Sequence, residues 1–268
     1  MKRLISIFSM VCVFSAAFSL SAAAIPPGAD TAKAAIAASP RHSEYVEVAL
    51  PGSETKIRSW VSFPESKDKA PVIIVIHEIF GLTEWIESVA DALAAEGFIA
   101  IAPDLISGVE GAKENARAAI GTLTDEEVVK RLNAVRDYGL ALPAANGKLG
   151  TIGFCWGGKS SFLYAVEQPK LDAAVVYYGT APAPETLSAI VAPVQAHYGQ
   201  NDERVNATIA PTEAKMKELE KTFEHSIYEG AGHGFLRQQS GQDGANKKAS
   251  EQAWAKTVEF LKARTAVK

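Results

Sequence analysis

A continuous β-branched run, Val72–Ile76, limits the fold of this chain more than any other segment. Such a run is typical of a strand buried on both faces of a mostly parallel sheet. Further strands are predicted at Phe98–Ile101, Leu149–Gly153, Ala173–Tyr178, Val194–Tyr198 and Ser226–Tyr228. Helices are predicted at Trp85–Ala95, Asp125–Ala141, Lys159–Glu167, Pro211–Thr222 and Ala249–Ala263. Repeated alternation of strand and helix predicts an α/β fold with a doubly wound sheet.

An N-terminal antiparallel hairpin is predicted before this alternation. Tyr45–Leu50 and Ile57–Phe63 each alternate apolar and polar residues, and Pro51-Gly52-Ser53 joins them. The sequence shows no internal repeat and no second core. We therefore predict one domain over residues 44–268.

The first residues have the pattern of a signal peptide, predicted over residues 1–24. Lys2 and Arg3 precede an apolar run that ends at Leu20, and small residues follow it. A membrane anchor is the alternative interpretation. Residues 25–43 are rich in Ala and Pro without a steady amphipathic period, so they are predicted to be a flexible lead-in. The expected location is secreted or periplasmic.

Charge and composition exclude some classes of partner. The 268 residues carry a formal net charge of −4, which becomes −6 once the basic Lys2 and Arg3 are removed. A negative chain binds polyanions poorly, and no basic stripe or zinc-ligand spacing is present. We expect no nucleic-acid partner and no membrane span after signal cleavage.

A single cysteine, Cys155, remains after cleavage and lies in the segment Gly153-Phe154-Cys155-Trp156-Gly157-Gly158. This segment ends a predicted strand and precedes a predicted helix, which is the pattern of a nucleophile elbow with Cys in place of Ser. The flanking glycines are expected where a Cβ would collide with neighbouring backbone. The helix N-terminus favours a thiolate there. A buried structural cysteine is the alternative.

The best candidate base among five histidines is His233, in the Gly-rich loop between the last predicted strand and the last predicted helix. His197 and His225 lie in or beside a strand and are interpreted as structural, and His42 lies in the lead-in. Asp202 follows the preceding strand and is the candidate orienting acid, with Glu203 as its competitor. The order Cys155, Asp202, His233 is that of α/β-hydrolases.

The loop His77-Glu78-Ile79-Phe80-Gly81-Leu82 directly follows the run Val72–Ile76. A loop in this place supplies half of an oxyanion hole, and the amide after the nucleophile supplies the other half. The predicted amides are those of Ile79 and Trp156. A His-Glu-x-x-His zinc site is excluded because Gly81 stands where the second histidine is needed.

These four loops together resemble the dienelactone hydrolase family over about residues 44–264. The resemblance implies an α/β-hydrolase fold and a triad of Cys155, His233 and Asp202. It also implies that the Glu78 carboxylate contacts the thiol before substrate arrives, and that Arg237 holds a substrate carboxylate. Capping of the following helix is the structural alternative for Glu78.

For a second substrate-binding arginine of the family, the sequence offers only Lys113 or Arg117. We predict hydrolysis of small ester or lactone substrates, anionic ones included, through a thioester on Cys155. No metal or organic cofactor is implied. The alternatives are a thioesterase or acyltransferase with the same triad, and a binding or redox-sensing protein on a hydrolase scaffold.

Overall fold

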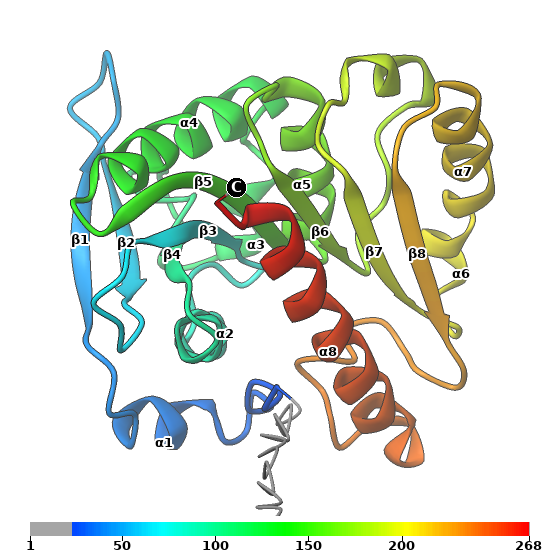
Figure 1. Cartoon of the computed structure of the whole chain (residues 1–268), viewed down its shortest axis with the longest axis horizontal. Helices are drawn as coiled ribbons and strands as arrows, with labels where there is room; N and C mark the ends of the chain where they lie inside the picture. Colours follow the sequence, from blue (N-terminus) through cyan, green and yellow to red (C-terminus); the bar gives the residue numbers. More distant parts are fainter. Residues whose placement is uncertain (1–22, 268) are drawn as a thin grey trace, which may run out of the picture.

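The computed structural model describes residues 23–267, which form an eight-stranded sheet with helices on both faces (Figure 1). The strands are β1 (Ser43–Ala49), β2 (Lys56–Ser62), β3 (Ala70–Ile76), β4 (Ile99–Pro103), β5 (Ala145–Phe154), β6 (Ala173–Tyr177), β7 (Val194–Gly199) and β8 (Phe223–Tyr228). β1 pairs with β2, and β2 with β4, in antiparallel fashion. All other neighbouring strands are parallel. The predicted N-terminal hairpin and mostly parallel sheet are confirmed.

The order of the strands, β1-β2-β4-β3-β5-β6-β7-β8, positions the functional loops. The chain runs from β3 to β4 in one direction, and then crosses to the other side of β3 to form β5. In open α/β sheets, ligands bind outside the carboxyl ends of the strands at such a reversal. The loops after β3 and β5 are therefore neighbours at the expected position of a site.

Two layers of helices cover the sheet. The longer helices are α2 (Glu84–Ala95) and α8 (Ala245–Thr265) on one face, and α4 (Asp125–Ala141), α5 (Trp156–Glu167) and α7 (Ile209–Glu218) on the other. Figure 1 shows α2 and α8 in front of the sheet. The short elements are α1 (Ala32–Ala37), α3 (Ala116–Ile120), α6 (Glu203–Asn206) and two 3₁₀ helices at Pro184–Ala189 and Gln242–Gly244.

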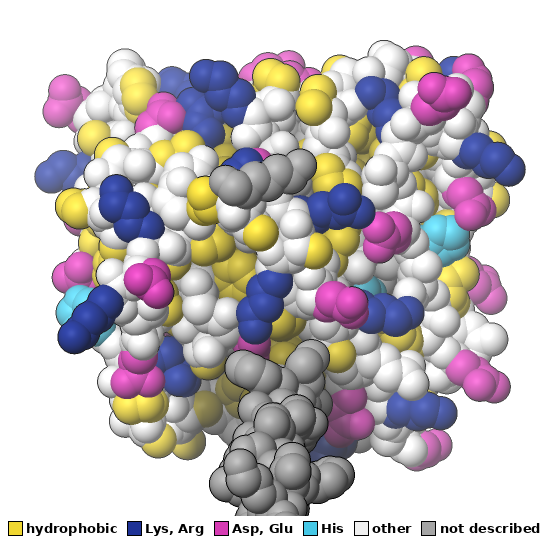
Figure 2. Space-filling model, in the orientation of Figure 1, with side chains coloured by type: hydrophobic (Ala, Val, Ile, Leu, Met, Phe, Trp, Pro, Cys, Tyr) yellow, Lys and Arg dark blue, Asp and Glu magenta, His cyan; other side chains and the backbone are white. Residues whose placement is uncertain are grey.

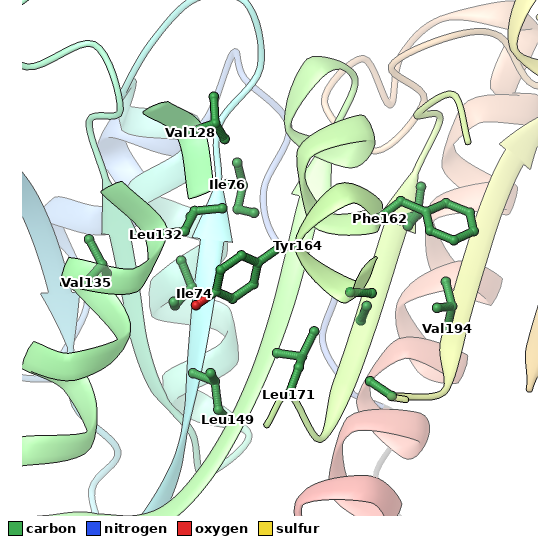
Figure 3. Packing of buried hydrophobic residues seen from close by; sticks show 14 of the residues in the cluster. Ile74, Ile76, Val128, Leu132, Val135, Leu149, Phe162, Tyr164, Leu171 and Val194 are labelled. Carbon is green, nitrogen blue, oxygen red and sulfur yellow. The ribbon is translucent and has the colours of Figure 1, made fainter. Parts of the chain in front are cut away.

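β3 shows how the sequence forms two cores. Its residues alternate between the layers, because successive side chains of a strand point to opposite faces. Ile74 packs with Leu132 of α4 and Tyr164 of α5 (Figure 3), whereas Ile73 belongs to the cluster under α2 and α8. All five residues of the run Val72–Ile76 are fully buried, as predicted for a strand covered on both faces.

Every predicted strand and helix is present, with shifts at the ends. β8 begins three residues earlier than predicted. It is the last strand of the sheet, where the polar residues Glu224 and His225 remain accessible to solvent, so the start of the strand has no apolar pattern. Helices α3 and α6, which have 5 and 4 residues, were not predicted. Elements this short are below the length at which a helical period can be recognised.

The segment expected to be a flexible lead-in is docked on the domain. Helix α1 packs against α2, and Ala32 is completely buried. Hydrogen bonds of the Pro26 and Ala29 backbone and the burial of Ala32 hold the segment, and neither produces an amphipathic period in the sequence. The predicted signal peptide, residues 1–24, lies outside the described residues except for its last two.

No helix within residues 23–267 is long and apolar enough to cross a membrane. On the face drawn in Figure 2, acidic and basic side chains are interspersed rather than gathered into one area of a single sign.

Candidate active site

Cys155 occupies a sharp turn between β5 and α5. Its φ of 56° and ψ of −113° lie outside the regions that residues with a side chain normally adopt. The backbone N–H of Cys155 donates a 3.0 Å hydrogen bond to the carbonyl of Tyr177, at the end of the neighbouring strand β6. Such strain persists only where the surroundings enforce it, and it is concentrated at functional sites.

The glycines on both sides of the turn are required by close backbone packing, as expected. A Cβ on Gly153 would lie 1.9 Å from the carbonyl oxygen of Gly157. A Cβ on Gly157 would lie 2.2 Å from the carbonyl oxygen of Ile76, at the end of β3. The elbow is therefore pressed against its own helix and against the loop that follows β3.

The thiol is the only cysteine in the described chain, and it is partly exposed. It lies at the start of the 12-residue helix α5, whose free N–H groups and dipole stabilise negative charge. Cysteines with a chemical role are found in such partly exposed positions at helix N-termini, whereas structural cysteines are buried.

His233 and Asp202 meet at the same edge of the sheet. Asp202 follows β7 and His233 lies in the loop after β8; the imidazole Nδ1–H donates a 2.5 Å hydrogen bond to Oδ2 of Asp202. Because Nδ1 is engaged, Nε2 is the ring atom that can exchange a proton with a thiol. Asp202 is buried, whereas its competitor Glu203 is exposed. The structure brings Asp202 to the histidine.

The charge state of His233 depends on its two neighbours. Burial by itself lowers the pKa of the imidazole, but the hydrogen bond that the ring donates to Asp202 and the interaction with Cys155 outweigh burial and raise the pKa to about 9. The sulfur thus lies within electrostatic reach of the ring, although no well-aligned hydrogen bond joins the two in residues 23–267. At neutral pH the imidazole of His233 is therefore protonated.

Glu78 and Arg237 form a buried ion pair beside this group. Their Oε2 and Nε atoms are 2.5 Å apart, without the alignment of a hydrogen bond. Burial raises the pKa of the Glu78 carboxyl, while Arg237 and His233 act in the opposite direction. The resemblance implied that Glu78 contacts the thiol, whereas in this structure its partner is Arg237. The side chain of Arg237 also lies over the ring of Phe80, 5.0 Å from the centroid.

The loop after β3 is held next to the elbow by His77. This fully buried ring donates from Nδ1 to the carbonyl of Glu78 (2.6 Å) and accepts at Nε2 from the N–H of Leu105 (3.1 Å). It also stacks on Trp156, with 5.3 Å between the ring centroids. His77 therefore fixes the backbone on which Ile79 lies close to the turn that carries Trp156. Both predicted oxyanion amides belong to these two adjoining segments.

Tyr178 is a feature of the site that the sequence analysis missed. It follows β6 with a φ of 39°, its side chain is fully buried, and its ring is 5.1 Å from that of His233. Burial raises the pKa of its hydroxyl well above the usual range, and the Glu78 carboxylate adds to the shift. Among the described residues the hydroxyl has no hydrogen-bond partner. A tyrosine at the end of a strand gives no signal of this geometry.

The remaining histidines and candidate cations make no hydrogen bond or ion pair with Cys155, His233 or Asp202 within residues 23–267. His197 is buried within the sheet, His225 stacks on Phe223 at the edge strand, and His42 is exposed. Lys113 and Arg117, the candidates for a second substrate-binding cation, are both exposed. Within residues 23–267 no group of three or more His, Cys, Asp or Glu side chains has the geometry of a metal site.

A glycine-flanked strand–turn–helix elbow after β5, with a histidine and an acid on later loops of a mostly parallel sheet, is the arrangement of the α/β-hydrolase class. Comparison with a solved structure agrees at the level of the fold. The protein titled "Putative Dienelactone Hydrolase" from Klebsiella pneumoniae superposes with a TM-score of 0.72 at 24% sequence identity, over 85% of this chain and 99% of that chain.

Within that class, the chain belongs to the dienelactone hydrolase family, whose model matches residues 57–265. It is 28% identical over 257 residues to a protein of Saccharolobus solfataricus named "Putative carboxymethylenebutenolidase", covering 81% of this chain and 97% of that one. A Bradyrhizobium protein named "Probable 2-oxo-3-(5-oxofuran-2-ylidene)propanoate lactonase" is also 28% identical, over 82% and 93% of the two chains. The chain is thus an enzyme of the ester- and lactone-hydrolysing type.

Proposed function

We propose that this enzyme cleaves small ester or lactone substrates through a covalent thioester on Cys155. The observation that carries the proposal is the 2.5 Å hydrogen bond between His233 and Asp202, next to a thiol on a strained elbow. These groups have the roles of base, orienter and nucleophile in this class. The family membership supports the type of bond that is cleaved.

In the first half of the reaction, the Cys155 thiolate attacks the carbonyl carbon of the substrate, and the carbonyl oxygen becomes an oxyanion. The backbone N–H groups of Ile79 and Trp156 donate hydrogen bonds to this oxyanion. When the intermediate collapses, the C–O bond to the leaving group breaks. The proton held on His233 passes to the departing oxygen, which leaves an acyl group on sulfur.

In the second half, His233 accepts a proton from water, and the resulting hydroxide attacks the thioester carbonyl. Collapse breaks the C–S bond, releases the carboxylic acid and restores the thiolate–imidazolium pair. Asp202 keeps Nδ1 engaged throughout, so Nε2 remains directed to the reacting atoms. No other reactant is needed.

The ion pair of Arg237 with Glu78 supports anionic substrates. The Glu78 carboxylate lies close to the Arg237 guanidinium but is not aligned for a hydrogen bond. A substrate carboxylate can accept hydrogen bonds from two parallel N–H groups of the guanidinium and so binds it more strongly. Binding of such a substrate releases the Glu78 carboxylate, whose pKa burial already raises. On the pattern of residues 1–24, we further propose that the enzyme acts outside the cytoplasm.

The test is a comparison of wild type, Cys155→Ala and Cys155→Ser on a panel of small lactones, esters and thioesters. We expect Cys155→Ala to lower kcat/KM by roughly a thousandfold or more, as removal of a nucleophile does in triad enzymes. Mass spectrometry of the quenched reaction should show an acyl adduct on Cys155 of the wild type. An unchanged rate in Cys155→Ala would show that the proposal is wrong.

A further inference from the structure

The N-terminal segment 25–37 is fixed to the loop that carries His233 and Arg237. The Gln239 side-chain amide donates a 2.8 Å hydrogen bond to the carbonyl of Pro26, and the N–H of Ala29 donates a 3.0 Å hydrogen bond to the carbonyl of Arg237. Just beyond the segment, the Arg41 guanidinium Nε donates a 2.8 Å hydrogen bond to the Asp91 carboxylate on α2. The segment is thus anchored at both ends, and one anchor is the backbone of a candidate substrate-binding residue.

A pocket of about 570 Å³ lies between this segment and the active-site loops. It is lined by residues of three origins: Ala29, Asp30 and Lys33 from the segment; Phe80, Thr83, Glu84 and Trp85 from the loop after β3 and the start of α2; and Arg237. The family match begins at residue 57, so the wall formed by the segment lies outside the region shared with the family.

The pocket adjoins the proposed reaction centre. Phe80 directly follows Ile79, whose amide is assigned to the oxyanion, and Arg237 pairs with Glu78. A substrate with its carbonyl at Cys155 can therefore extend past Arg237 into the pocket. The volume is sufficient for one ring or a short chain, since ligand pockets begin at roughly 300 Å³.

The lining favours a planar apolar group over a charged one. Beyond Arg237, the charge of Lys33 is matched by Asp30 and Glu84, so this part of the lining has no excess positive charge for a second anionic group. The prominent apolar surface is the ring of Phe80, which is 51% exposed and carries the Arg237 guanidinium over it. Aromatic rings and guanidinium planes both stack on flat π-systems.

We propose that segment 25–37 completes a substrate pocket that takes the aromatic end of an ester, remote from the bond that is cleaved. The proposal rests on the ester-hydrolase function proposed above and specifies its substrate class. In this arrangement Ala29 supplies space in the wall, Phe80 supplies the stacking surface, and the Ala29–Arg237 hydrogen bond positions the loop between the pocket and His233.

The experiment uses esters that differ only in planarity. Benzyl acetate is compared with cyclohexylmethyl acetate, and ethyl phenylacetate with ethyl cyclohexylacetate, so that both the alcohol and the acyl side are tested. In the wild type, kcat/KM should favour the aromatic member of at least one pair by roughly fivefold, the usual size of an aromatic stacking contribution. Binding of the intact esters to Cys155→Ala, followed by ligand-observed NMR, should show the same ratio in Kd.

Two variants remove the preference. Ala29→Trp fills the pocket from the segment, and Phe80→Leu removes the ring from an exposed position with little change in volume; each should bring the ratio to about one. Ala34→Trp is the matched control, because Ala34 is exposed, does not line the pocket and points about 100° away from Lys33 around α1. It should keep the wild-type ratio. Thermal unfolding of each variant confirms that it is folded.

The outcomes separate this proposal from the function on which it rests. An unchanged rate in Cys155→Ala overturns the ester-hydrolase mechanism but leaves the ratios measurable. Absence of an aromatic preference in both pairs, or a preference that survives both Ala29→Trp and Phe80→Leu, overturns the pocket proposal. A preference lost equally in Ala34→Trp also overturns it, because the effect would then be a general disturbance of the segment.

Discussion

Two histidines near the last strands of the sheet, His197 fully buried and His233 partly exposed, show how neighbouring groups decide the chemistry of an imidazole. His197 lies inside β7, and burial together with Lys256 lowers its pKa to about 3. Burial also acts to lower the pKa of His233, but Asp202 and Cys155 raise it to about 9. The same side chain is therefore a neutral structural group in the sheet and an imidazolium in the loop beyond it.

The polar surroundings of the two histidines differ in the same way. The His197 ring is within hydrogen-bond distance of the hydroxyls of Tyr228 (2.9 Å) and Thr257 (3.0 Å) and of the side chain of Gln195 (3.1 Å). Around His233, by contrast, the backbone of Cys155 is strained and the Tyr178 hydroxyl is unpaired within the described chain. Satisfied networks stabilise a fold, whereas strained and unsatisfied groups are concentrated at functional sites.

Among the groups around the two histidines, the largest effect is expected from removing the Asp202 carboxylate, which raises the pKa of His233. Asp202→Asn should lower kcat/KM by roughly 10²- to 10⁴-fold, because the amide no longer stabilises an imidazolium or fixes its tautomer. Steady-state hydrolysis of a small ester measures the loss. Glu203→Gln is the matched control: its carboxylate is adjacent in sequence but exposed, and the variant should retain wild-type activity. Equal losses in both variants would contradict the assignment of Asp202.

The second prediction is that the pKa values of His233 and His197 differ by about six units. Titration of the imidazole C–H signals by NMR should give a midpoint of about 9 for His233, while His197 stays neutral down to about pH 3. In Asp202→Asn the His233 midpoint should fall, because the largest of the contributions that raise it is removed. Similar midpoints for the two rings would contradict the comparison.

The same shifts predict opposite pH dependences of stability. The His233 pKa is raised above its usual value of 6.5, so its stabilising contribution is complete below about pH 6.5 and is lost as the pH rises through 9. The His197 pKa is lowered, so its contribution is lost as the pH falls from 6.5 towards 3. The free energy of unfolding, measured with denaturant across this pH range, should decline on both sides for the wild type. In Asp202→Asn, part of the decline on the alkaline side should be lost, and the acid side should be unchanged.

The sequence predicted those parts of the site that depend on the residue type at a single position. Gly153 and Gly157 are needed because no Cβ fits there, and such a requirement can be recognised from spacing alone. Strands such as Val72–Ile76 were predictable because burial on both faces selects apolar residues at every position. The order of the elbow, the acid and the histidine then placed the main groups.

Features that depend on tertiary contacts could not be predicted. Docking of segment 25–37 uses backbone groups of Pro26 and Ala29, which any sequence carries. The choice between Asp202 and Glu203 depends on which carboxylate is turned toward the imidazole, and adjacent residues differ in this only once the loop is folded. The pairing of Glu78 with Arg237 joins loops 159 positions apart in the sequence, so no local pattern reports it.

The smallest effect is expected from Tyr178, whose unpaired hydroxyl belongs to the surroundings of His233 rather than to those of His197. A buried hydroxyl without a partner costs stability, so Tyr178→Phe should leave the free energy of unfolding unchanged or raise it by up to roughly 1 kcal/mol. If the hydroxyl donates to the Glu78 carboxylate or to the substrate during the reaction, kcat/KM should fall by roughly fivefold, the value of one such hydrogen bond.

Tyr198→Phe is the matched control for this variant, because the Tyr198 hydroxyl is also buried and unpaired within residues 23–267 but lies in the opposite core cluster. It should change stability in the same direction and leave kcat/KM unchanged. Wild-type activity in both variants would show that the Tyr178 hydroxyl has no role in the reaction. A loss confined to Tyr178→Phe would show that an unsatisfied group, like the strain at Cys155, is retained because the reaction uses it.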